Sequence, residues 1–330
     1  MKILIVKTSS LGDIIHTFPF IAELKRRFPD AQIDYAVEEP FSALLDAHPM
    51  IQNSICLSSQ EWRKGQNLAS LKDFIRRLRS ETYDLLFDLQ GNIKSGLVTR
   101  LARALKKIGF GYQTVAEWPN LLFTDTRVNP PKGKNIRHDY LYFLTSVFAE
   151  ETNSPEQKVT LQISEKEKDL IDSMVRTCKP KVMVAAGAAW PNKTLPINDL
   201  KTFLHTFSSH TCFYFIWGNE EEKRGSEELH RTFKDRSILT PKLALPALQN
   251  LMAKMDLVVA MDSLPLHLAA TTKVATFAFF GPSSGSKYAP NDQFVQGSCP
   301  YSVTFEKRCP HLRTCKTAEC MKNFTFNLER

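Results

Sequence analysis

The sequence predicts an α/β protein built from two parallel-sheet domains. Short apolar runs typical of buried strands alternate with amphipathic stretches typical of helices, and the alternation begins again after the polar segment Thr152–Lys168. The chain has 330 residues, 43% of them hydrophobic, which is enough for two cores. We therefore expect two Rossmann-like halves that face each other across a cleft, with a ligand at the carboxyl ends of the strands.

The first half opens with the apolar run Ile3–Val6, which we expect to form a buried strand, and continues with an amphipathic helix over Gly12–Phe28. The other elements of this half follow the same alternation. Strands are expected at Gln32–Val37, Ser54–Leu57 and Leu85–Asp88, and helices at Pro40–Ala47, Leu68–Glu81 and Lys94–Ala104.

The second half repeats this organisation. Strands are expected at Lys181–Ala185, Cys212–Ile216, Leu257–Ala260 and Val274–Phe280, and helices at Asp199–Ser209, Glu220–Phe233, Ala247–Lys254 and Pro265–Thr271. We divide the chain into an N-terminal domain (residues 1–160), a C-terminal domain (161–298) and a cysteine-rich tail (299–330) that packs back on the N-terminal domain.

The composition narrows the function classes. A formal net charge of +8 favours anionic partners such as nucleotides or phosphorylated lipids. Basic residues are interspersed with acidic ones and no aromatic–basic RNA motif is present, so a nucleic-acid binder is the least favoured class. The sequence shows no signal peptide and no apolar run of roughly 18 residues, so we expect a cytoplasmic chain that touches a membrane only at its surface.

Polar residues gather where the predicted strands end. Lys7–Asp13 (KTSSLGD) follows the first strand and starts a helix, where backbone N–H groups and the helix dipole favour an anion. Helix capping by Ser10 or Asp13 explains the same residues without a ligand. Similar clusters follow five other strands, which favours a ligand site; they lie in Phe87–Ala102, Ala185–Pro196, Phe215–Arg224, Val258–Ala270 and Phe279–Gly285.

These stretches resemble glycosyltransferase family 9, the ADP-heptose-dependent lipopolysaccharide heptosyltransferases, over about residues 1–290. The motifs are MKILIVKTSSLGDIIHTFPF, FDLQGNIKSGLVTRLA and MDSLPLHLAA followed by FFGPSS, and KTSSLGD, Trp62–Lys64 and DLQGNIKS are most similar to the heptosyltransferase I branch. The resemblance implies a GT-B fold, with the acceptor on the N-terminal half and the nucleotide sugar on the C-terminal half. It also implies transfer of heptose from ADP-heptose to Kdo of an anionic, membrane-held lipid A–Kdo acceptor.

The resemblance assigns roles to individual residues. Asp13 matches the general base, Lys193 the residue that holds the diphosphate, and Glu222 the residue that binds the ribose. The residues that match the motif at the donor phosphates and sugar are Asp262, Ser263 and His267. The alternative for His267 is a purely structural histidine. The alternative for Glu222 is an ordinary acidic residue at a helix start, in which case Glu220 or Glu221 would be better placed to bind the ribose.

For the acceptor we expect contacts from polar and basic side chains of the first half. They are Lys7, Ser10, Arg63, Lys64, Gln90 and Lys94. Lys7 could instead pair with Asp13. The basic helix Lys72–Arg79 fits an anionic membrane surface, and a solvated helix face explains it equally well.

Two positions depart from the family pattern. Leu264 stands where the family has a glycine, which predicts weaker contact between that backbone amide and a donor phosphate. Ala116 precedes Glu117 where heptosyltransferase I has an arginine, which removes one contact to the acceptor phosphate.

The expected chemistry is a single inverting displacement. Asp13 removes the proton of the acceptor hydroxyl, and Lys193 with helix N-termini stabilises the leaving diphosphate, so neither a metal nor a cofactor is required. The tail cysteines Cys299, Cys309, Cys315 and Cys320 could hold a structural zinc or iron ion, but without a CxxC pair reduced thiols are the simpler interpretation. One alternative function is transfer of the sugar to another acceptor, either an outer heptose or a protein. A second alternative is a protein that binds a nucleotide sugar without transferring it, and the intact Asp13 argues against this one.

Overall fold

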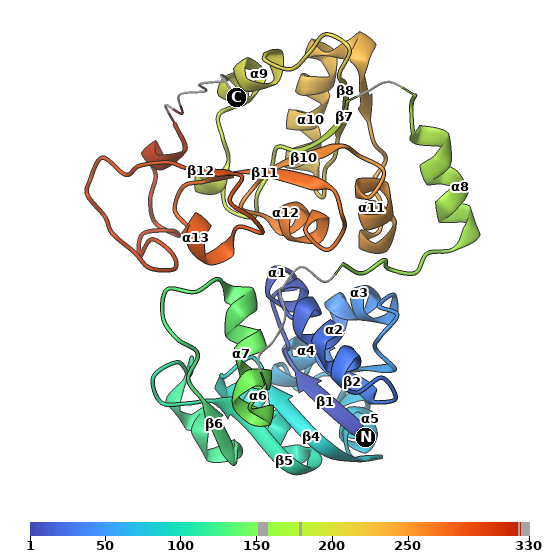
Figure 1. Cartoon of the computed structure of the whole chain (residues 1–330), viewed down its shortest axis with the longest axis vertical. Helices are drawn as coiled ribbons and strands as arrows, with labels where there is room; N and C mark the ends of the chain where they lie inside the picture. Colours follow the sequence, from blue (N-terminus) through green and yellow to red (C-terminus); the bar gives the residue numbers. More distant parts are fainter. Residues whose placement is uncertain (151–157, 178–179, 323, 325–330) are drawn as a thin grey trace. The chain divides into compact units, whose positions relative to one another are not determined.

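The computed structural model describes residues 1–150, 158–177, 180–322 and 324. The chain divides into two compact units, each drawn in Figure 1. Unit 1 comprises Met1–Lys132 and Ile136–Gln162, and unit 2 comprises Gly133–Asn135 and Ile163–Arg330. The polypeptide therefore enters unit 2 briefly before it returns to complete unit 1.

Unit 1 is built on a parallel sheet that has six strands within the described residues, in the order β3-β2-β1-β4-β5-β6. Its strands are β1 (Lys2–Val6), β2 (Gln32–Glu38), β3 (Asn53–Leu57), β4 (Thr82–Asp88), β5 (Arg103–Phe110) and β6 (Thr126–Val128). Its helices are α1 (Leu11–Ile15), α2 (Phe18–Arg27), η1 (Glu39–Phe41), α3 (Ser42–Asp46), α4 (Ser59–Arg63), α5 (Leu68–Leu78), α6 (Ile93–Leu101), η2 (Trp118–Phe123) and α7 (Ile136–Phe148). This strand order reverses between β1 and β4, the position where doubly wound sheets bind ligands.

Unit 2 repeats the topology of unit 1. Its parallel sheet has six strands in the part of the chain that the structure describes, in the order β12-β11-β10-β7-β8-β9, so its reversal lies between β7 and β10. Its strands are β7 (Lys181–Ala185), β8 (Cys212–Phe215), β9 (Ser237–Leu239), β10 (Leu257–Met261), β11 (Ala275–Phe280) and β12 (Phe294–Gln296). Its helices are α8 (Glu165–Met174), η3 (Pro191–Lys193), α9 (Ile197–His205), α10 (Glu220–Thr232), η4 (Lys234–Arg236), α11 (Leu245–Met252), α12 (Leu264–Ala269), α13 (Gly285–Tyr288) and η5 (Glu319–Met321).

The helix predicted over Gly12–Phe28 is two helices, α1 and α2. Pro19 is the second residue of α2 and has no N–H to donate to the preceding turn, so one continuous helix would lose a hydrogen bond there. The hydroxyl of Thr17 donates to the carbonyl oxygen of Ile14 at 2.7 Å and closes the end of α1. The break leaves α1 as a short helix that carries Asp13 close to the end of β1.

The helix predicted over Lys94–Ala104 is too long. It ends at Leu101, and β5 begins at Arg103 and pairs in parallel with β4. Three of the five residues Arg103–Lys107 are basic and the stretch contains no long apolar run, so the pairing with β4 decides their structure. The strand β4 itself begins at Thr82, three residues before the predicted start.

The predicted linker Thr152–Lys168 lies partly outside the described residues, and its end forms α8. The described tail residues make contacts within unit 2. The N–H of Cys309 donates to the carbonyl oxygen of Pro282 at 2.7 Å, and Met321 is buried in the core of unit 2. The predicted packing of the tail against the N-terminal domain stays a prediction.

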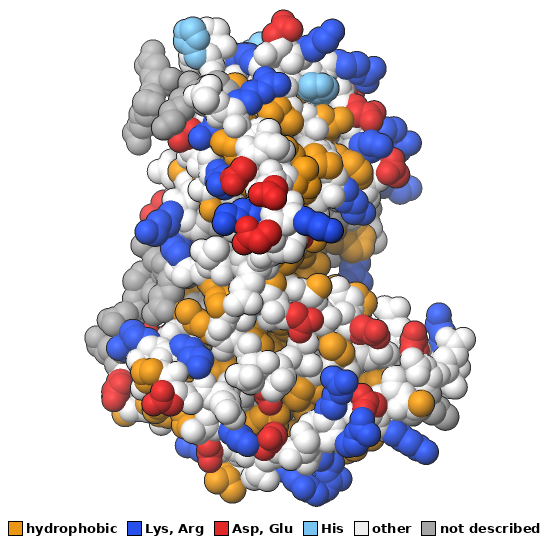
Figure 2. Space-filling model, turned by 90° about the vertical axis from the view of Figure 1, so that its right-hand side faces the viewer, with side chains coloured by type: hydrophobic (Ala, Val, Ile, Leu, Met, Phe, Trp, Pro, Cys, Tyr) orange, Lys and Arg blue, Asp and Glu red, His pale blue; other side chains and the backbone are white. Residues whose placement is uncertain are grey.

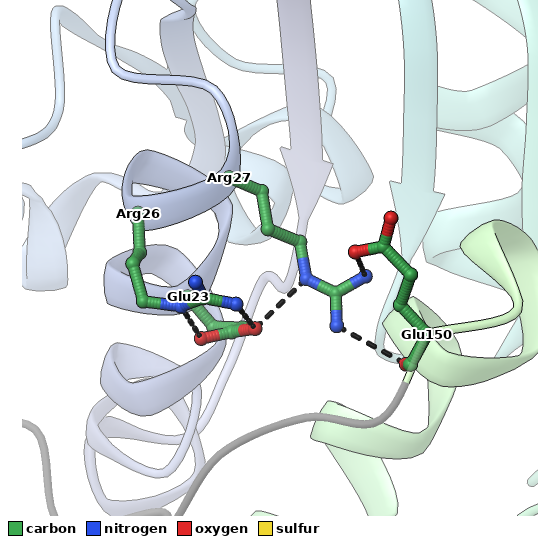
Figure 3. Close-up of polar contacts among 4 residues, drawn as sticks. All are labelled: Glu23, Arg26, Arg27 and Glu150. Carbon is green, nitrogen blue, oxygen red and sulfur yellow. Dashed lines mark hydrogen bonds and ion pairs between the residues drawn. The ribbon is translucent and has the colours of Figure 1, made fainter.

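An ion cluster around the buried side chains of Glu23 and Arg27 joins α2 to Glu150, two residues beyond α7 (Figure 3). Glu23 is 1% exposed and accepts hydrogen bonds of 2.8 Å from both Arg26 and Arg27. Arg27 also donates to the carbonyl oxygen of Glu150 at 3.2 Å and lies over the ring of Phe148. The hydrogen bond from Arg26 is the largest effect on the pKa of Glu23, and it acts with Arg27 to lower that pKa despite burial.

The surface in the view of Figure 2 carries charges of both signs. On the face that Figure 2 shows, Lys and Arg side chains are interspersed with Asp and Glu side chains. A nucleic-acid backbone would need an extended surface of one sign. The absence of a nucleic-acid partner stays a prediction.

Candidate active site

The first turn of unit 1 meets the end of β4 at the reversal of the strand order. Ser10 caps α1, and its N–H and hydroxyl both donate to Oδ2 of Asp13, at 3.2 and 2.8 Å. The peptide bond between Ser9 and Ser10 is cis, and the N–H of Ser9 donates to Oε1 of Gln90 at 3.4 Å. The structure thus brings together three of the predicted residues: the expected base and two expected acceptor contacts.

Asp13 is both a capping residue and a carboxylate at the surface of the strand ends. It is the third residue of α1 and is partly exposed. Its contacts with Ser10 fix the orientation of the carboxyl group, which a general base requires. The capping interpretation of the sequence and the catalytic interpretation are therefore compatible.

Lys94 pairs with a residue that the sequence analysis did not select. Its Nζ lies 2.6 Å from Oε1 of Glu38, the last residue of β2. The hydroxyl of Ser59 donates to the same oxygen, and the N–H of Glu38 donates to the carbonyl oxygen of Thr8 at 3.1 Å. Glu38 could have been found, because it is the first charged residue after the apolar stretch YAV at the end of that strand.

Asp88 organises the turn that carries Gln90. Its side chain is fully buried and accepts hydrogen bonds from the N–H groups of Gln90 and Gly91, both at 3.0 Å, and from the side chains of Ser95 and Asn120. Burial raises the pKa of Asp88 even though these donors act in the opposite direction. Gly91 in this turn has φ +73°, a conformation that favours glycine.

The other predicted acceptor residues are more dispersed. Lys7 is 5% exposed, and its Nζ lies 5.6 Å from the ring centroid of Tyr140 on α7. Arg63 is the last residue of α4 and Lys64 follows it as an exposed residue. The side chain of Arg63 lies outside the described part of the structure. Lys64 follows α4, whose first residue Ser59 donates to Glu38, and its contact with the acceptor stays a prediction.

A buried ion cluster occupies the reversal of the strand order in unit 2. Nζ of Lys193, in η3 after β7, lies 2.5 Å from Oδ2 of Asp262, which follows β10. Nε2 of His267 on α12 lies 3.4 Å from Oδ1 of the same carboxylate. The side chains are 10%, 8% and 7% exposed, respectively. Three residues that the resemblance assigned to the donor are thus in contact.

The cluster determines the ionisation of Asp262. Burial alone would raise its pKa, but the hydrogen bond from His267 and the charge of Lys193 outweigh burial and hold the pKa well below its usual range. Asp262 is therefore a carboxylate, and it keeps a cationic lysine at a strand end where an anionic ligand would bind.

Ser263 and Leu264 start α12 with ordinary geometry. Ser263 is the N-cap residue in an extended conformation, and Leu264 is the first helical residue. Leu264 is not among the non-glycine residues with positive φ. A leucine at the position of the family's glycine therefore fits here without backbone strain.

Glu222 lies against the ends of β7 and β8. Its Oε2 accepts a hydrogen bond from the N–H of Gly218 at 2.7 Å. A Cβ atom at Gly187 would lie 2.3 Å from Cγ of Glu222, so only glycine allows this approach. Glu222 is thereby held near the start of α10, as expected for a residue that faces a ligand at the strand ends.

The four tail cysteines line one cavity of about 500 Å³, and all are free thiols. Burial raises the pKa of Cys320 to about 11, and the charges of Cys299 and Cys315 add to the shift. Among the described residues, no group of three or more His, Cys, Asp or Glu side chains is arranged to hold a metal ion. That the tail cysteines are reduced thiols stays a prediction.

No helix in the described part of the chain has both the length and the apolar character needed to cross a bilayer.

Comparisons with known proteins agree with the fold and with the motifs. The curated protein lipopolysaccharide heptosyltransferase 1 of Pseudomonas aeruginosa is 26% identical over 326 residues, covering 95% of this chain and 89% of its own length. The protein of the same name from Escherichia coli K12 is 26% identical over 290 residues, covering 86% and 88%. Both relatives thus match this chain over most of its length.

Two solved structures share the fold. The E. coli heptosyltransferase WaaC with ADP has a TM-score of 0.77 at 23% identity, covering 90% of this chain and 94% of its own. The E. coli ADP-heptose LPS heptosyltransferase II has a TM-score of 0.68 at 22% identity, covering 97% and 96%. The two Rossmann-like units are therefore those of a GT-B fold.

The sequence profile of glycosyltransferase family 9 (heptosyltransferase) matches residues 71–313, well over half of the chain. This range includes the Gln90 turn, Lys193, Glu222 and the Asp262–His267 motif. The chain belongs to glycosyltransferase family 9, the heptosyltransferases.

Proposed function

We propose that this glycosyltransferase moves a heptose from ADP-heptose to Kdo of a lipid A–Kdo acceptor, with inversion at the anomeric carbon. The observation that carries the proposal is the buried Lys193–Asp262–His267 cluster at the reversal of strand order in unit 2. The names of the relatives support the donor and the acceptor class, since they are lipopolysaccharide heptosyltransferases 1. A structure of the similar protein WaaC holds ADP.

Unit 2 is proposed to bind the nucleotide sugar. Lys193 would meet the diphosphate, and its positive charge would stabilise the negative charge that grows on the leaving group. Asp262 keeps the lysine in place, Ser263 and His267 would contact the phosphates and the sugar, and Glu222 would accept hydrogen bonds from the ribose hydroxyls. In this proposal the fixed charge of the protein performs the electrostatic work, and no metal is required.

Unit 1 is proposed to bind the acceptor. Asp13 would take the proton of the Kdo hydroxyl as that oxygen attacks the anomeric carbon, while the bond to the diphosphate breaks. Gln90, Ser10, Lys7 and Lys94 would position the acceptor around this carboxylate. Because the acceptor is a lipid, we propose that the reaction takes place at the cytoplasmic surface of the inner membrane.

The test is ADP release by the purified protein. We expect release from ADP-heptose that depends on Kdo-bearing lipid A, and a product in which the new bond has the inverted configuration. Reactions without acceptor, and reactions with an ADP-hexose donor, are the controls. Tight ADP binding without release in the presence of this acceptor would contradict the proposed acceptor, and failure to bind ADP would contradict the proposed donor site.

A further inference from the structure

Most of the large apolar side chains that unit 1 exposes among its described residues lie in one stretch of chain, from Ile93 to Leu122. Leu105, Leu122 and Trp118 are 76%, 71% and 70% exposed. Single exposed apolar residues are normal, whereas a group of them marks an interaction site. We call the group the α6 surface; it consists of Ile93, Leu97, Leu101, Leu105, Trp118 and Leu122.

Three of these residues lie on one face of α6. Ile93, Leu97 and Leu101 follow each other at intervals of four residues, which places them along one side of a helix. The opposite side of α6 is buried, with Val98 in a core cluster of unit 1. The exposed stripe is therefore additional to the face that α6 uses for the fold.

The segment η2 extends this stripe. A Cβ atom at Gly96 would lie 2.4 Å from the ring of Phe123, so η2 packs directly on α6. Oε2 of Glu117 accepts a hydrogen bond from the N–H of Ile93 at 2.8 Å. Trp118, the next residue, is thereby held near the start of α6, and Leu122 precedes the ring that packs on Gly96.

Basic residues outnumber acidic ones in the stretch of chain that carries the apolar side chains. The stretch from Ile93 to Arg127 contains six Lys or Arg and two Asp or Glu, so its formal charge is +4. Arg100 and Arg103 are exposed at the end of α6 and the start of β5. Burial is the main cause that lowers the pKa of Lys107; the charge of Asp125 opposes this shift and the charge of Arg100 adds to it.

The charge favours an anionic partner over a second copy of the chain. A symmetric dimer through the α6 surface would bring these cations against the same cations of the partner, which is unfavourable. A bilayer that contains anionic lipids satisfies both properties of the surface. Leucine and isoleucine side chains enter the headgroup boundary, tryptophan prefers this interface, and Lys and Arg attract anionic headgroups.

The α6 surface also begins beside the proposed acceptor site. Ile93 precedes Lys94, whose Nζ pairs with Glu38 at the strand ends. We propose that the α6 surface docks unit 1 on a bilayer of anionic phospholipid; the expected benefit, access to a lipid-held acceptor, rests on the proposed function. The proposal assigns no docking role to the basic helix α5, whose Arg77 pairs with Asp73 on its own helix at 2.9 Å, and α5 variants therefore serve as a control.

The test is sedimentation of the full-length protein with vesicles of phosphatidylglycerol and phosphatidylethanolamine, compared with vesicles of phosphatidylcholine. We expect binding to the anionic vesicles, and about tenfold weaker binding for Leu97→Ser/Leu105→Ser/Leu122→Ser. The matched control is Leu170→Ser, an exposed leucine of α8 in unit 2. It should bind as the unchanged protein does. Retained ADP affinity and circular dichroism show that the triple variant is folded.

A second pair of variants tests the charge. Arg100→Glu/Arg103→Glu should weaken vesicle binding about tenfold, whereas Arg76→Glu/Arg77→Glu on α5 should not. Equal binding of the triple variant and the unchanged protein would overturn the proposal, as would an effect of the α5 pair as large as that of the α6 pair. The proposal would also be overturned if the triple substitution converted a dimer to a monomer and left vesicle binding unchanged. That result would assign the α6 surface to contact with a second copy of the chain.

Turnover separates this inference from the proposed function. The triple variant should lose activity on an acceptor embedded in vesicles and keep it on a deacylated, water-soluble acceptor. If neither protein turns over either acceptor while the vesicle results are as expected, the proposed function fails and the docking surface stands. If both proteins turn over both acceptors equally, the proposed function stands and the docking surface fails.

Discussion

Unit 1 and unit 2 share one strand order, so β4 of unit 1 corresponds to β10 of unit 2, and a buried aspartate stands at the end of each strand. The donors to Asp88 that are described above are all uncharged groups, and burial raises the pKa of Asp88. Asp262 faces His267 and Lys193, and its pKa is lowered despite burial. At equivalent strand ends, Asp88 thus organises a turn of uncharged groups in unit 1, and Asp262 forms an ion pair in unit 2.

The difference indicates how the two units divide the chemistry. In unit 1 the buried aspartate shapes the turn of Gln90, and the carboxylate proposed to react is a different one, Asp13, which is partly exposed. In unit 2 the buried aspartate holds the lysine proposed to meet the diphosphate. Changes at the two reversals should therefore affect different steps.

The largest expected effect is on turnover. Asp13→Asn should lower kcat about 10³-fold, because the amide keeps the capping contacts but cannot accept a proton. The affinity for ADP should not change, since Asp13 belongs to unit 1. Steady-state kinetics and ADP titration measure the two quantities, and Asp30→Asn, an exposed carboxylate after α2, is the control. A variant with normal kcat would remove Asp13 as the base.

The next effect is on the stability of unit 2. Lys193→Met leaves a buried carboxylate with only His267 opposite it and should lower the free energy of unfolding by about 3 kcal/mol. The double variant Lys193→Met/Asp262→Asn should recover most of this loss, while ADP affinity stays low in both. Urea unfolding measures the free energy of unfolding of each variant, and titration with ADP measures its affinity for the nucleotide. Equal stability of the single and double variants would mean that the ion pair does not hold the cluster together.

A smaller effect is expected away from both reversals. Glu23→Gln should lower the free energy of unfolding by about 2 kcal/mol, because the buried Arg27 loses a charged partner. Glu81→Gln, in the exposed ion pair with Lys2, should change it by less than about 1 kcal/mol. Neither substitution should change kcat. A large loss of activity without a loss of stability would show that this cluster acts on the active site.

The Glu23 cluster also predicts a pH dependence. The folded-state pKa of Glu23 is below its unfolded value of about 4.3, so the stabilisation is present above that pH. It is lost as the pH falls through the folded pKa. The stability difference between the unchanged protein and Glu23→Gln should therefore be constant from pH 7 to 5 and become smaller below about pH 4, as urea unfolding at each pH would show.

The smallest expected effect is on donor affinity. Gly187→Ala would place a methyl group against Glu222 and displace it, which should weaken ADP binding about tenfold, or 1.4 kcal/mol. Gly225→Ala on α10 is the matched control, since a Cβ there meets no atom within 4 Å. That variant should bind ADP normally and be slightly more stable. If Gly187→Ala binds ADP normally, Glu222 does not contact the nucleotide.

The sequence predicted most strands of both sheets because their apolar runs are buried by the fold, as in KILIV and LVVAM. It missed β5 because the first half of this strand is rich in basic residues and forms by pairing with β4, which no local pattern records. It also missed α7, the helix whose Tyr140 lies beneath Lys7.

The candidate site was predictable as a set of residue types at strand ends, but not as a set of partners. Lys193, Asp262 and His267 are in contact as a consequence of strand order, and 69 residues separate the first two. The pairing of Lys94 with Glu38 depends in the same way on the neighbouring positions of β1 and β2. Sequence spacing carries no information on such partners.

The short segment Gly133–Asn135 has a practical consequence for work with separate halves. Lys287 donates from Nζ to the carbonyl oxygen of Lys134 at 2.8 Å, and Asn135 donates to the carbonyl oxygen of Ala289 at 2.9 Å. A polypeptide that starts at residue 163 would lack these partners, and the anchoring cation Lys287 is 7% exposed. A single protease cut after residue 162 would leave residues 133–135 on one fragment and their partners Lys287 and Ala289 on the other, so these hydrogen bonds would then be noncovalent contacts between two fragments. Expression of the C-terminal half alone should therefore include residues 133–135 as a tethered peptide.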